Sequence, residues 1–586
     1  MGIIQELKNR GVIQTAALYI AVAWGGIEIL TFLIDALFGG RIAALANRYL
    51  AILLIAGFPV TMYLAWTRDL GLRARRVVRA TALAVLLVLV IIWLVPSGQE
   101  VPRPSESSAG DVTALAVLPL ENLSDEPGQE FFAAGMTEAL IAELSRLGAI
   151  RVISRTSVMQ YAGTTKTIPE IAAELGVDAI VEGSVLRAGN QVRITAQLID
   201  AATDLHLWAD SFEGVVEDVL ALQSEAAQSM VDGIGASFRS ETVRLQPPRQ
   251  VFPEAYDAFL EAQLTGLESQ RDPQAAIAAI ERAISLDPTF APAYALLSEV
   301  YGYLALTTNV RQGDAYLQAR QLARKALELD PNHPSSRFAM ARALFQFEWD
   351  WAGAEAQFSE GIRLDPNDAN GLALYGSFRT LIHWDCDGGL QRLESARNRD
   401  PFNPAMHFDL GVYHFHCRNY EVSLQHLERT TDLLPEFYWA RLIAVWNHMM
   451  LGAGGRAEIL CDALLEEVGD TFDPRLIGSC AWAYFGASRS DRAFELRAQL
   501  DNPPEGIEVD PFIYSWTCLG FADRNCALEQ LERALKQRSS DLIFLRTGPI
   551  FDTVREEPRF KAVVQKMGFP ETPEFGGNLE RQPHQE

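Results

Sequence analysis

The chain of 586 residues lacks the short motifs that commonly hold nucleotides or metal ions. It contains no GxxxxGK(S/T) phosphate loop and no GxGxxG turn, so nucleotide binding has little support. Its cysteines form no CxxC pair, which argues against a zinc knuckle and a thioredoxin-type redox motif. No nucleophile–base pair or paired acids stand out. We therefore predict no catalytic, cofactor-binding or metal-binding residues, no cofactor, and a protein that is not an enzyme.

Basic residues are scarce in most of the chain. It carries 50 Lys and Arg against 75 Asp and Glu. Residues 1–96 hold nine of the basic residues and four of the acids, which leaves 41 basic against 71 acidic residues in the remainder. A body this acidic is repelled by phosphate backbones and by anionic lipid surfaces. We therefore predict that the protein has no nucleic-acid partner.

Cysteine is also rare, and all six cysteines lie in the C-terminal half. Their even number permits disulfides if this half is exported. Small buried thiols on helices are the alternative, and we prefer it. The cysteines are Cys386, Cys417, Cys461, Cys480, Cys518 and Cys526.

Long apolar runs are confined to the N-terminal region, at Val12–Phe38, Ala46–Trp66 and Ala80–Val95. The first two exceed the length that spans a bilayer, and the third is short but uniformly apolar. Five arginines lie within Arg68–Arg79, and positive residues stay on the cytoplasmic side. We therefore predict a bacterial inner-membrane protein that contacts the lipid bilayer through three transmembrane helices. Its N-terminus would be cytoplasmic and residues 97–586 periplasmic.

Composition divides the chain into six segments. The predicted segments are a cytoplasmic tail (1–11), a membrane anchor (12–96), a Pro/Ser-rich linker (97–111), an α/β domain (112–240), helical repeats (253–571) and a disordered tail (572–586).

The pattern of residues 112–240 predicts an α/β sandwich in the order β-α-β-α-β-β-α. A helix over Phe131–Leu147 has apolar residues at steps of about four. Gly176 ends the next helix, and the strands Ala179–Leu186 and Gln191–Ile199 flank a hairpin turn. The remaining predicted elements are strands at Thr113–Leu120 and Ile150–Ser154 and helices at Ile168–Leu175 and Glu217–Ile234.

Several segments of this domain resemble, in order, the TolB-like (FlgO-related) domains of bacterial membrane-anchored proteins. The segments are Ala116–Ser124, Phe132–Leu140, Val152–Ser157, Glu182–Val185, Arg193–Asp200 and His206–Ala209. The resemblance implies an envelope protein or a sensor, and it carries over no catalytic residue. In that architecture the TolB-like domain precedes tetratricopeptide repeats.

Helix-like segments of the C-terminal half end at prolines that are 43, 35, 35 and 34 residues apart. A period of this size predicts stacked helix pairs, because one pair alone cannot bury its apolar face. Small residues at fixed positions, which let helices approach closely, resemble those of tetratricopeptide (TPR) repeats. These are Ala276, Ala283, Ala354, Gly361, Ser377, Gly389, Ala396, Gly411 and Ser423. We therefore predict an all-α TPR solenoid.

A solenoid of this kind has a concave face that can hold another protein. We predict a non-enzymatic scaffold or sensor, with a protein or peptide partner in the groove of residues 253–540, where aromatic residues are dense. The alternative is a transmembrane signal transducer that contacts a cytoplasmic output protein through Arg68–Arg79. The sequence leaves open the oligomeric state and the role of Glu28 in the membrane.

Two groups of polar residues could have either a chemical role or a purely structural one. His206, close to Asp210, could act in acid–base chemistry, but a solvated or packing residue is the interpretation we prefer. A second group has metal-ligand residue types, but packing at helical spacing explains His407 and His414, and it is the interpretation we prefer. Its members are His407, His414, His416, Cys417 and His426.

Overall fold

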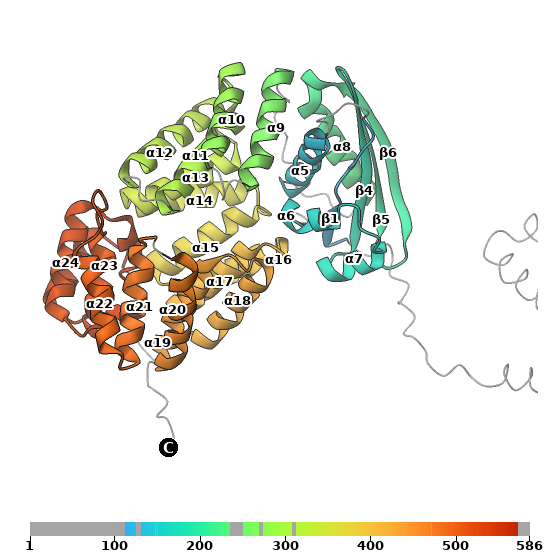
Figure 1. Cartoon of the computed structure of the whole chain (residues 1–586). Helices are drawn as coiled ribbons and strands as arrows, with labels where there is room; N and C mark the ends of the chain where they lie inside the picture. Colours follow the sequence, from blue (N-terminus) through green and yellow to red (C-terminus); the bar gives the residue numbers. More distant parts are fainter. Residues whose placement is uncertain are drawn as a thin grey trace, which may run out of the picture. The chain divides into compact units, whose positions relative to one another are not determined.

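The computed structural model describes residues 112–571, apart from 125–129, 147, 149, 235–249, 269–272, 308–311 and 470. An α/β domain is followed by a solenoid of paired helices (Figure 1). The predicted cytoplasmic tail, membrane anchor, linker and C-terminal tail lie outside the described residues.

The α/β domain is built on one mixed sheet in which the strands are ordered β3-β1-β4-β5-β6. Strand β1 is parallel to β3 and β4, whereas β4, β5 and β6 form an antiparallel meander. The short strand β2 pairs with β4. The bounds are β1 (Ala114–Val117), β2 (Glu121–Asn122), β3 (Arg151–Val152), β4 (Ala179–Ala188), β5 (Gln191–Asp200) and β6 (Leu205–Val215).

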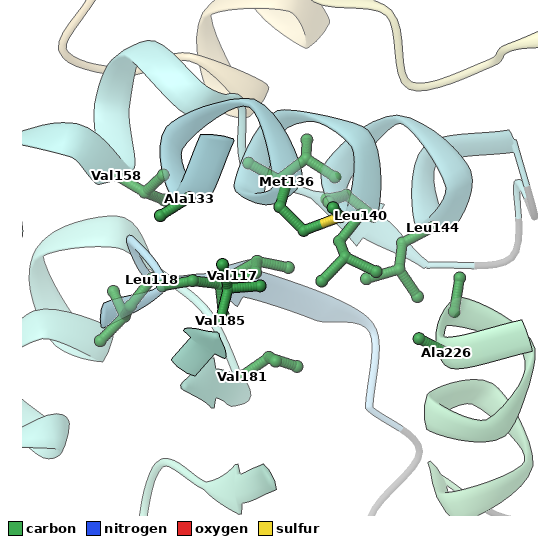
Figure 2. Close-up of a cluster of buried hydrophobic side chains, with 14 of the residues drawn as sticks. Val117, Leu118, Ala133, Met136, Leu140, Leu144, Val158, Val181, Val185 and Ala226 are labelled. Atoms are coloured by element: carbon green, nitrogen blue, oxygen red, sulfur yellow. The ribbon is translucent and has the colours of Figure 1, made fainter. Parts of the chain in front are cut away.

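Helices α5 (Glu130–Arg146) and α8 (Val219–Ile234) pack together against this sheet. The i, i+4 spacing predicted for α5 is confirmed, because Met136, Leu140 and Leu144 are all buried. Figure 2 shows these side chains beside those of the sheet and of α8. The remaining helices of the domain are α6 (Arg155–Val158), η2 (Met159–Tyr161), α7 (Ile168–Leu175) and η3 (Val216–Asp218).

The predicted order of elements omits one long strand. Residues Leu205–Val215 form β6, which pairs with the whole of β5. Strand β6 was not predicted for a physical reason. Most side chains of β6 are exposed, so its sequence lacks the alternation of apolar and polar residues that marks a half-buried strand.

The prediction of three transmembrane helices is corrected. Within the described residues, every helix is too short or too polar to cross a bilayer. The stretches on which the prediction rested lie in residues 12–96, outside the described part. The fold class is therefore a small mixed sheet with its helices followed by a helical solenoid, and the multi-pass inner-membrane location is not supported.

The solenoid contains eight antiparallel helix pairs in the described residues. Its inner helices are α9 (Pro253–Glu268), α11 (Ala291–Thr307), α13 (Pro334–Ala343), α15 (Ala369–His383), α17 (Pro404–His416), α19 (Tyr438–Met450), α21 (Pro474–Gly486) and α23 (Pro511–Gly520). Its outer helices are α10 (Pro273–Leu286), α12 (Gln312–Leu329), α14 (Trp351–Leu364), α16 (Cys386–Arg399), α18 (Tyr420–Leu433), α20 (Gly454–Val468), α22 (Ser490–Asp501) and α24 (Arg524–Gln537). Short elements η5 (Leu344–Glu348), η6 (Ser540–Phe544), η7 (Pro549–Thr553) and α25 (Pro558–Met567) complete it.

The predicted small positions are confirmed as helix–helix contacts. Ala276, Ala354 and Ala396 have no exposed surface. The hydroxyl of Ser423 on α18 donates to the carbonyl of Gly411 on α17 at 2.6 Å, which joins the two helices of a pair at their closest approach. Close packing of each pair therefore follows from the repeat pattern.

The C-terminal segment returns to the middle of the solenoid. The indole of Trp351 on α14 donates to the carbonyl of Met567 at 3.2 Å and stacks on Phe569 at 5.4 Å. The guanidinium of Arg546 donates to the carbonyl of Ile382, in the last turn of α15, at 2.9 Å. These contacts join residues that are far apart in sequence, so the solenoid curves back on itself.

Polar contacts hold the α/β domain against the solenoid at the ends of two outer helices. The amide of Asn367, after α14, donates to the carbonyls of Ser145 and Ile150 at 3.1 and 2.8 Å. The hydroxyl of Ser157 donates to Asp400, after α16, at 2.6 Å. The Asp-Pro steps at 365–366 and 400–401 therefore end helices and also lie at a domain contact.

Candidate functional site

A cavity of about 990 Å³ lies on the inner face of the solenoid. Its walls come from the inner helices α11 to α23, from η6 and η7, and from α5 of the α/β domain. The volume is that of a pocket for a ligand larger than a single amino acid. Both described parts of the chain therefore contribute to one site.

Three charged side chains from three inner helices lie in this cavity: Glu299 on α11, Arg342 on α13 and Asp409 on α17. Within the described residues, the carboxyl groups of Glu299 and Asp409 have no hydrogen bond or ion pair within 4.0 Å. The Nε atom of Arg342 is buried and has no hydrogen-bond partner either. We call these three residues the central charged group.

The environment changes the protonation of the central charged group. Burial raises the pKa of Glu299 to about 7, although Arg342 opposes the rise. Burial also raises the pKa of Asp409 to about 7, again against the effect of Arg342. Near neutral pH each carboxyl is therefore present in both charged and neutral forms, and a cation nearby would favour the charged form.

A second pair of charges borders the same cavity. The Nε atom of Arg155 lies 3.8 Å from Glu138, and burial raises the pKa of this carboxyl. Asp368, the N-cap of α15, accepts from the backbone N–H of Gly371 at 2.7 Å. Burial raises the pKa of Asp368 too. Together with the central charged group these are four acids and two arginines among the charged residues that line the cavity, which also include Glu143, Arg146, Asp365, Arg475 and Asp541.

Aromatic side chains form another part of the wall. Trp446 lies 5.5 Å from Trp516, and its indole N–H donates to Ser479 at 2.8 Å. The guanidinium of Arg475 lies 5.5 Å from the ring of Trp439 and pairs with Asp541 at 2.8 Å. Ten aromatic residues account for much of the aromatic density predicted to serve the groove, and five of them line the cavity: Phe345, Tyr413, Phe415, Trp439 and Trp446. The others are Phe347, Trp349, Trp351, Trp384 and Tyr438, of which Trp351 is buried in the solenoid core.

The structure divides the histidine group of the sequence analysis. His407 and His414 of α17 both lie beside His426 of α18, at ring distances of 5.7 and 5.5 Å. His416 lies apart from them, since its Nδ1 is 3.0 Å from the hydroxyl of Thr547. Cys417 is bonded to Cys386. Three of the five residues therefore form one cluster.

The other residues considered in the sequence lie on a strand, in a turn or in disulfides. His206, Trp208 and Asp210 lie on β6, where His206 and Asp210 are exposed. Gly189 adopts φ 59° in the β4–β5 turn, as the predicted hairpin requires.

The six cysteines form three disulfides, which decides between the disulfides and the free buried thiols that the sequence allowed. The pairs are Cys386–Cys417, Cys461–Cys480 and Cys518–Cys526.

The central charged group was not predicted from the sequence, although a signal for it exists. Glu299 is the only charged residue of α11, and Asp409 is the only acid of α17. A lone charge in an apolar helix marks a buried polar position, because burial of an ionised group is costly without a partner. The spatial convergence of the two residues cannot be read from this signal.

Comparison with known proteins gives one sequence relative and a set of helical structures. No family model matches the chain. A protein of Rhizobium meliloti (strain 1021) named "Putative adenylate cyclase 3" is 35% identical over 245 residues, which are 39% of this chain and 40% of that protein. The chain thus spans about two fifths of the relative's length.

Among solved structures, the chain is similar to PilF of Pseudomonas aeruginosa (21% identity, 36% of this chain and 93% of that one, TM-score 0.28). It is also similar to PilW, a type IV pilus biogenesis factor (18%, 36% and 94%, TM-score 0.31). A third is YrrB, a TPR protein with a peptide-binding site (21%, 32% and 89%, TM-score 0.21). Likenesses this remote carry no argument about family, so the resemblances to TPR repeats and to TolB-like domains both stay predictions.

The prediction that the protein is not an enzyme is corrected by the first of these comparisons. The relative from Rhizobium meliloti carries the name of an enzyme. The prediction rested on the lack of short sequence motifs, and such motifs cover only part of the known catalytic arrangements.

Proposed function

We propose that the cavity on the inner face of the solenoid binds a protein or peptide segment, and that a cationic side chain of this segment enters the central charged group. The observation that carries the proposal is the pair of carboxyl groups, Glu299 and Asp409, which have no partner among the described residues. At pH 8 both carboxyls are mostly ionised and the central charged group holds one guanidinium, so one of its negative charges is left over. A lysine or arginine side chain would balance it.

The rest of the wall supports a peptide as the ligand. Trp439, Trp446 and Trp516 offer large, rigid apolar surfaces, which act as anchors in protein recognition because little side-chain entropy is lost. The α5 helix of the α/β domain borders the same cavity through Glu138. The α/β domain would therefore be part of the binding surface rather than a separate module.

The first test compares nonapeptide pools that are random except at the central position. A fluorescent pool with a central lysine is expected to bind the full chain at least tenfold more tightly at pH 8 than a pool with a central norleucine, a difference of about 1.4 kcal/mol. Binding is expected to weaken at pH 6, since carboxyls with a pKa of about 7 are then mostly neutral. Fluorescence anisotropy measures both effects.

The variant Glu299→Gln/Asp409→Asn is expected to remove the preference for lysine and the dependence on pH. Glu466→Gln is the matched control, because this acid is exposed on the outer helix α20. Equal binding of the lysine and norleucine pools would contradict the proposal, and so would a preference that the double variant retains.

The similarity to the protein named "Putative adenylate cyclase 3" favours a second candidate function, the cyclisation of ATP. If this candidate is correct, the purified full chain is expected to form cyclic AMP from ATP in the presence of Mg²⁺ or Mn²⁺. Mass spectrometry detects the product, and a heat-denatured sample is the control. A folded protein that forms no cyclic AMP above this control would rule the candidate out.

A further inference from the structure

A cluster of metal-ligand side chains lies where three consecutive helices meet. Glu394 comes from α16, His414 from α17 and His426 from α18. One potential ligand atom from each residue lies within 4.8 Å of the other two. The side chains are partly accessible, since that of His426 is 18% exposed and that of Glu394 is 37% exposed. An ion from solution can therefore reach them.

Hydrogen bonds determine which nitrogen of His426 is free. The Nε2 atom of His407 lies 3.2 Å from the carbonyl oxygen of Pro401, which can only accept, so Nε2 carries the proton. In the neutral ring, a proton on Nε2 leaves Nδ1 of His407 as an acceptor. The Nδ1 atom of His426 lies 3.5 Å from this acceptor and donates to it. The Nε2 atom of His426 is then unprotonated, and it faces Glu394 at 4.0 Å.

The other two residues are also oriented by neighbours. Arg397 donates to one oxygen of Glu394 at 2.5 Å, which leaves the second oxygen toward His426. The side-chain amide of Asn419 lies 3.3 Å from Nδ1 of His414. In this orientation the amide nitrogen donates to Nδ1. With the amide oxygen and nitrogen exchanged, the oxygen would accept a hydrogen bond from Nδ1–H and leave Nε2 of His414 free as a ligand. Partners of this kind are typical of metal-binding histidines, whose second nitrogen is usually hydrogen-bonded.

We propose that Glu394, His414 and His426 bind one divalent zinc ion, with His407 as the residue that positions His426. Two imidazoles and one carboxylate form a donor set that zinc uses with a fourth position left to water or to a ligand. Zinc–nitrogen bonds of about 2.0–2.1 Å require donor atoms roughly 3.3 Å apart, so the side chains close by about 1 Å on binding. The ion would connect the pair α15/α16 to the pair α17/α18.

Zinc binding is measured on the full chain without a polyhistidine tag and with its disulfides intact, after chelator treatment and dialysis. Isothermal titration with ZnCl₂ is expected to show one site per chain, and zinc is expected to raise the melting temperature. His414→Ala and His426→Ala are expected to abolish this site. His407→Ala is expected to weaken it by about 10- to 100-fold, as loss of a positioning residue does.

His448→Ala is the matched control, because this histidine lies on α19 outside the cluster. Cobalt(II) gives a second measurement on the unchanged protein, since a tetrahedral site produces visible absorption bands that zinc displaces. Zinc uptake that survives both His414→Ala and His426→Ala would overturn the assignment. A wild-type protein without zinc uptake and without cobalt bands would overturn it as well.

Discussion

Replacement of Arg342 by methionine is expected to destabilise the protein by roughly 2 kcal/mol at pH 8 and by much less at pH 5.5. Arg342 is the cation beside Glu299 and Asp409, and it lowers the pKa of both carboxyls against the effect of burial. At pH 8 these groups are mostly ionised, so loss of the guanidinium leaves two negative charges in the cavity without the cation that compensates them. At pH 5.5 both are protonated, and Arg342 then has little to balance.

The sign of the pH dependence follows from the raised pKa values. The folded protein binds protons more tightly at Glu299 and Asp409 than the unfolded chain does, since their pKa of about 7 exceeds the usual value. The stabilising contribution of the protonated carboxyls is present below the unfolded pKa. It is lost as the pH rises toward 7. Arg342→Met makes this loss larger.

Urea denaturation followed by tryptophan fluorescence at the two pH values measures the effect. In a Glu299→Gln/Asp409→Asn background the same substitution is expected to cost little at either pH, because the charges it compensates are gone. Arg324→Met, on the exposed surface of α12, is the matched control and is expected to change stability by less than about 0.5 kcal/mol. A loss of stability that is equal at pH 5.5 and pH 8 would contradict the electrostatic explanation.

Gly389→Ala is expected to destabilise the protein by about 1–3 kcal/mol, although alanine favours helix more than glycine does. Gly389 lies on α16 where it crosses α15. A Cβ atom there would be 2.9 Å from the carbonyl oxygen of Gly376 and 3.1 Å from the backbone nitrogen of Thr380. These are backbone atoms, so relief of the contact requires that the two helices move apart.

Thermal unfolding by circular dichroism measures the change, and Gly455→Ala on α20 provides a control of opposite sign. Gly455 is exposed, and no atom lies within 4 Å of an added Cβ. Its replacement is expected to raise stability by up to about 1 kcal/mol. If both substitutions raised the melting temperature, close approach of α15 and α16 would not be the reason for glycine at position 389.

Much of the fold follows from local and periodic features of the sequence. The helix Ile168–Leu175 with its Gly176 cap is found at the predicted residues. The β4–β5 hairpin forms at the predicted turn, and the small residues Ala354 and Gly389 lie at helix contacts as expected. Such features are predictable because each depends on residues that are near in sequence or repeat at a fixed interval.

Three other predictions were wrong because they depend on more than a local sequence pattern. The strand β6 was missed, since its exposed side chains give no apolar alternation. The prediction of a non-enzyme rested on missing motifs, and a relative named as an enzyme overturned it. The preference for free thiols was wrong as well, because disulfide formation depends on which helices the fold brings together.

The sequence by itself determined that the C-terminal half is a stack of helix pairs, because a period of about 35 residues with small residues at the crossings is typical of that packing. Only the tertiary structure decided which side chains meet across that stack. The curvature of the solenoid brings Glu299, Arg342 and Asp409 from three repeats into one cavity, and it joins Trp351 to the carbonyl of Met567. These contacts depend on the small rotation between successive pairs, which no local pattern of residues encodes.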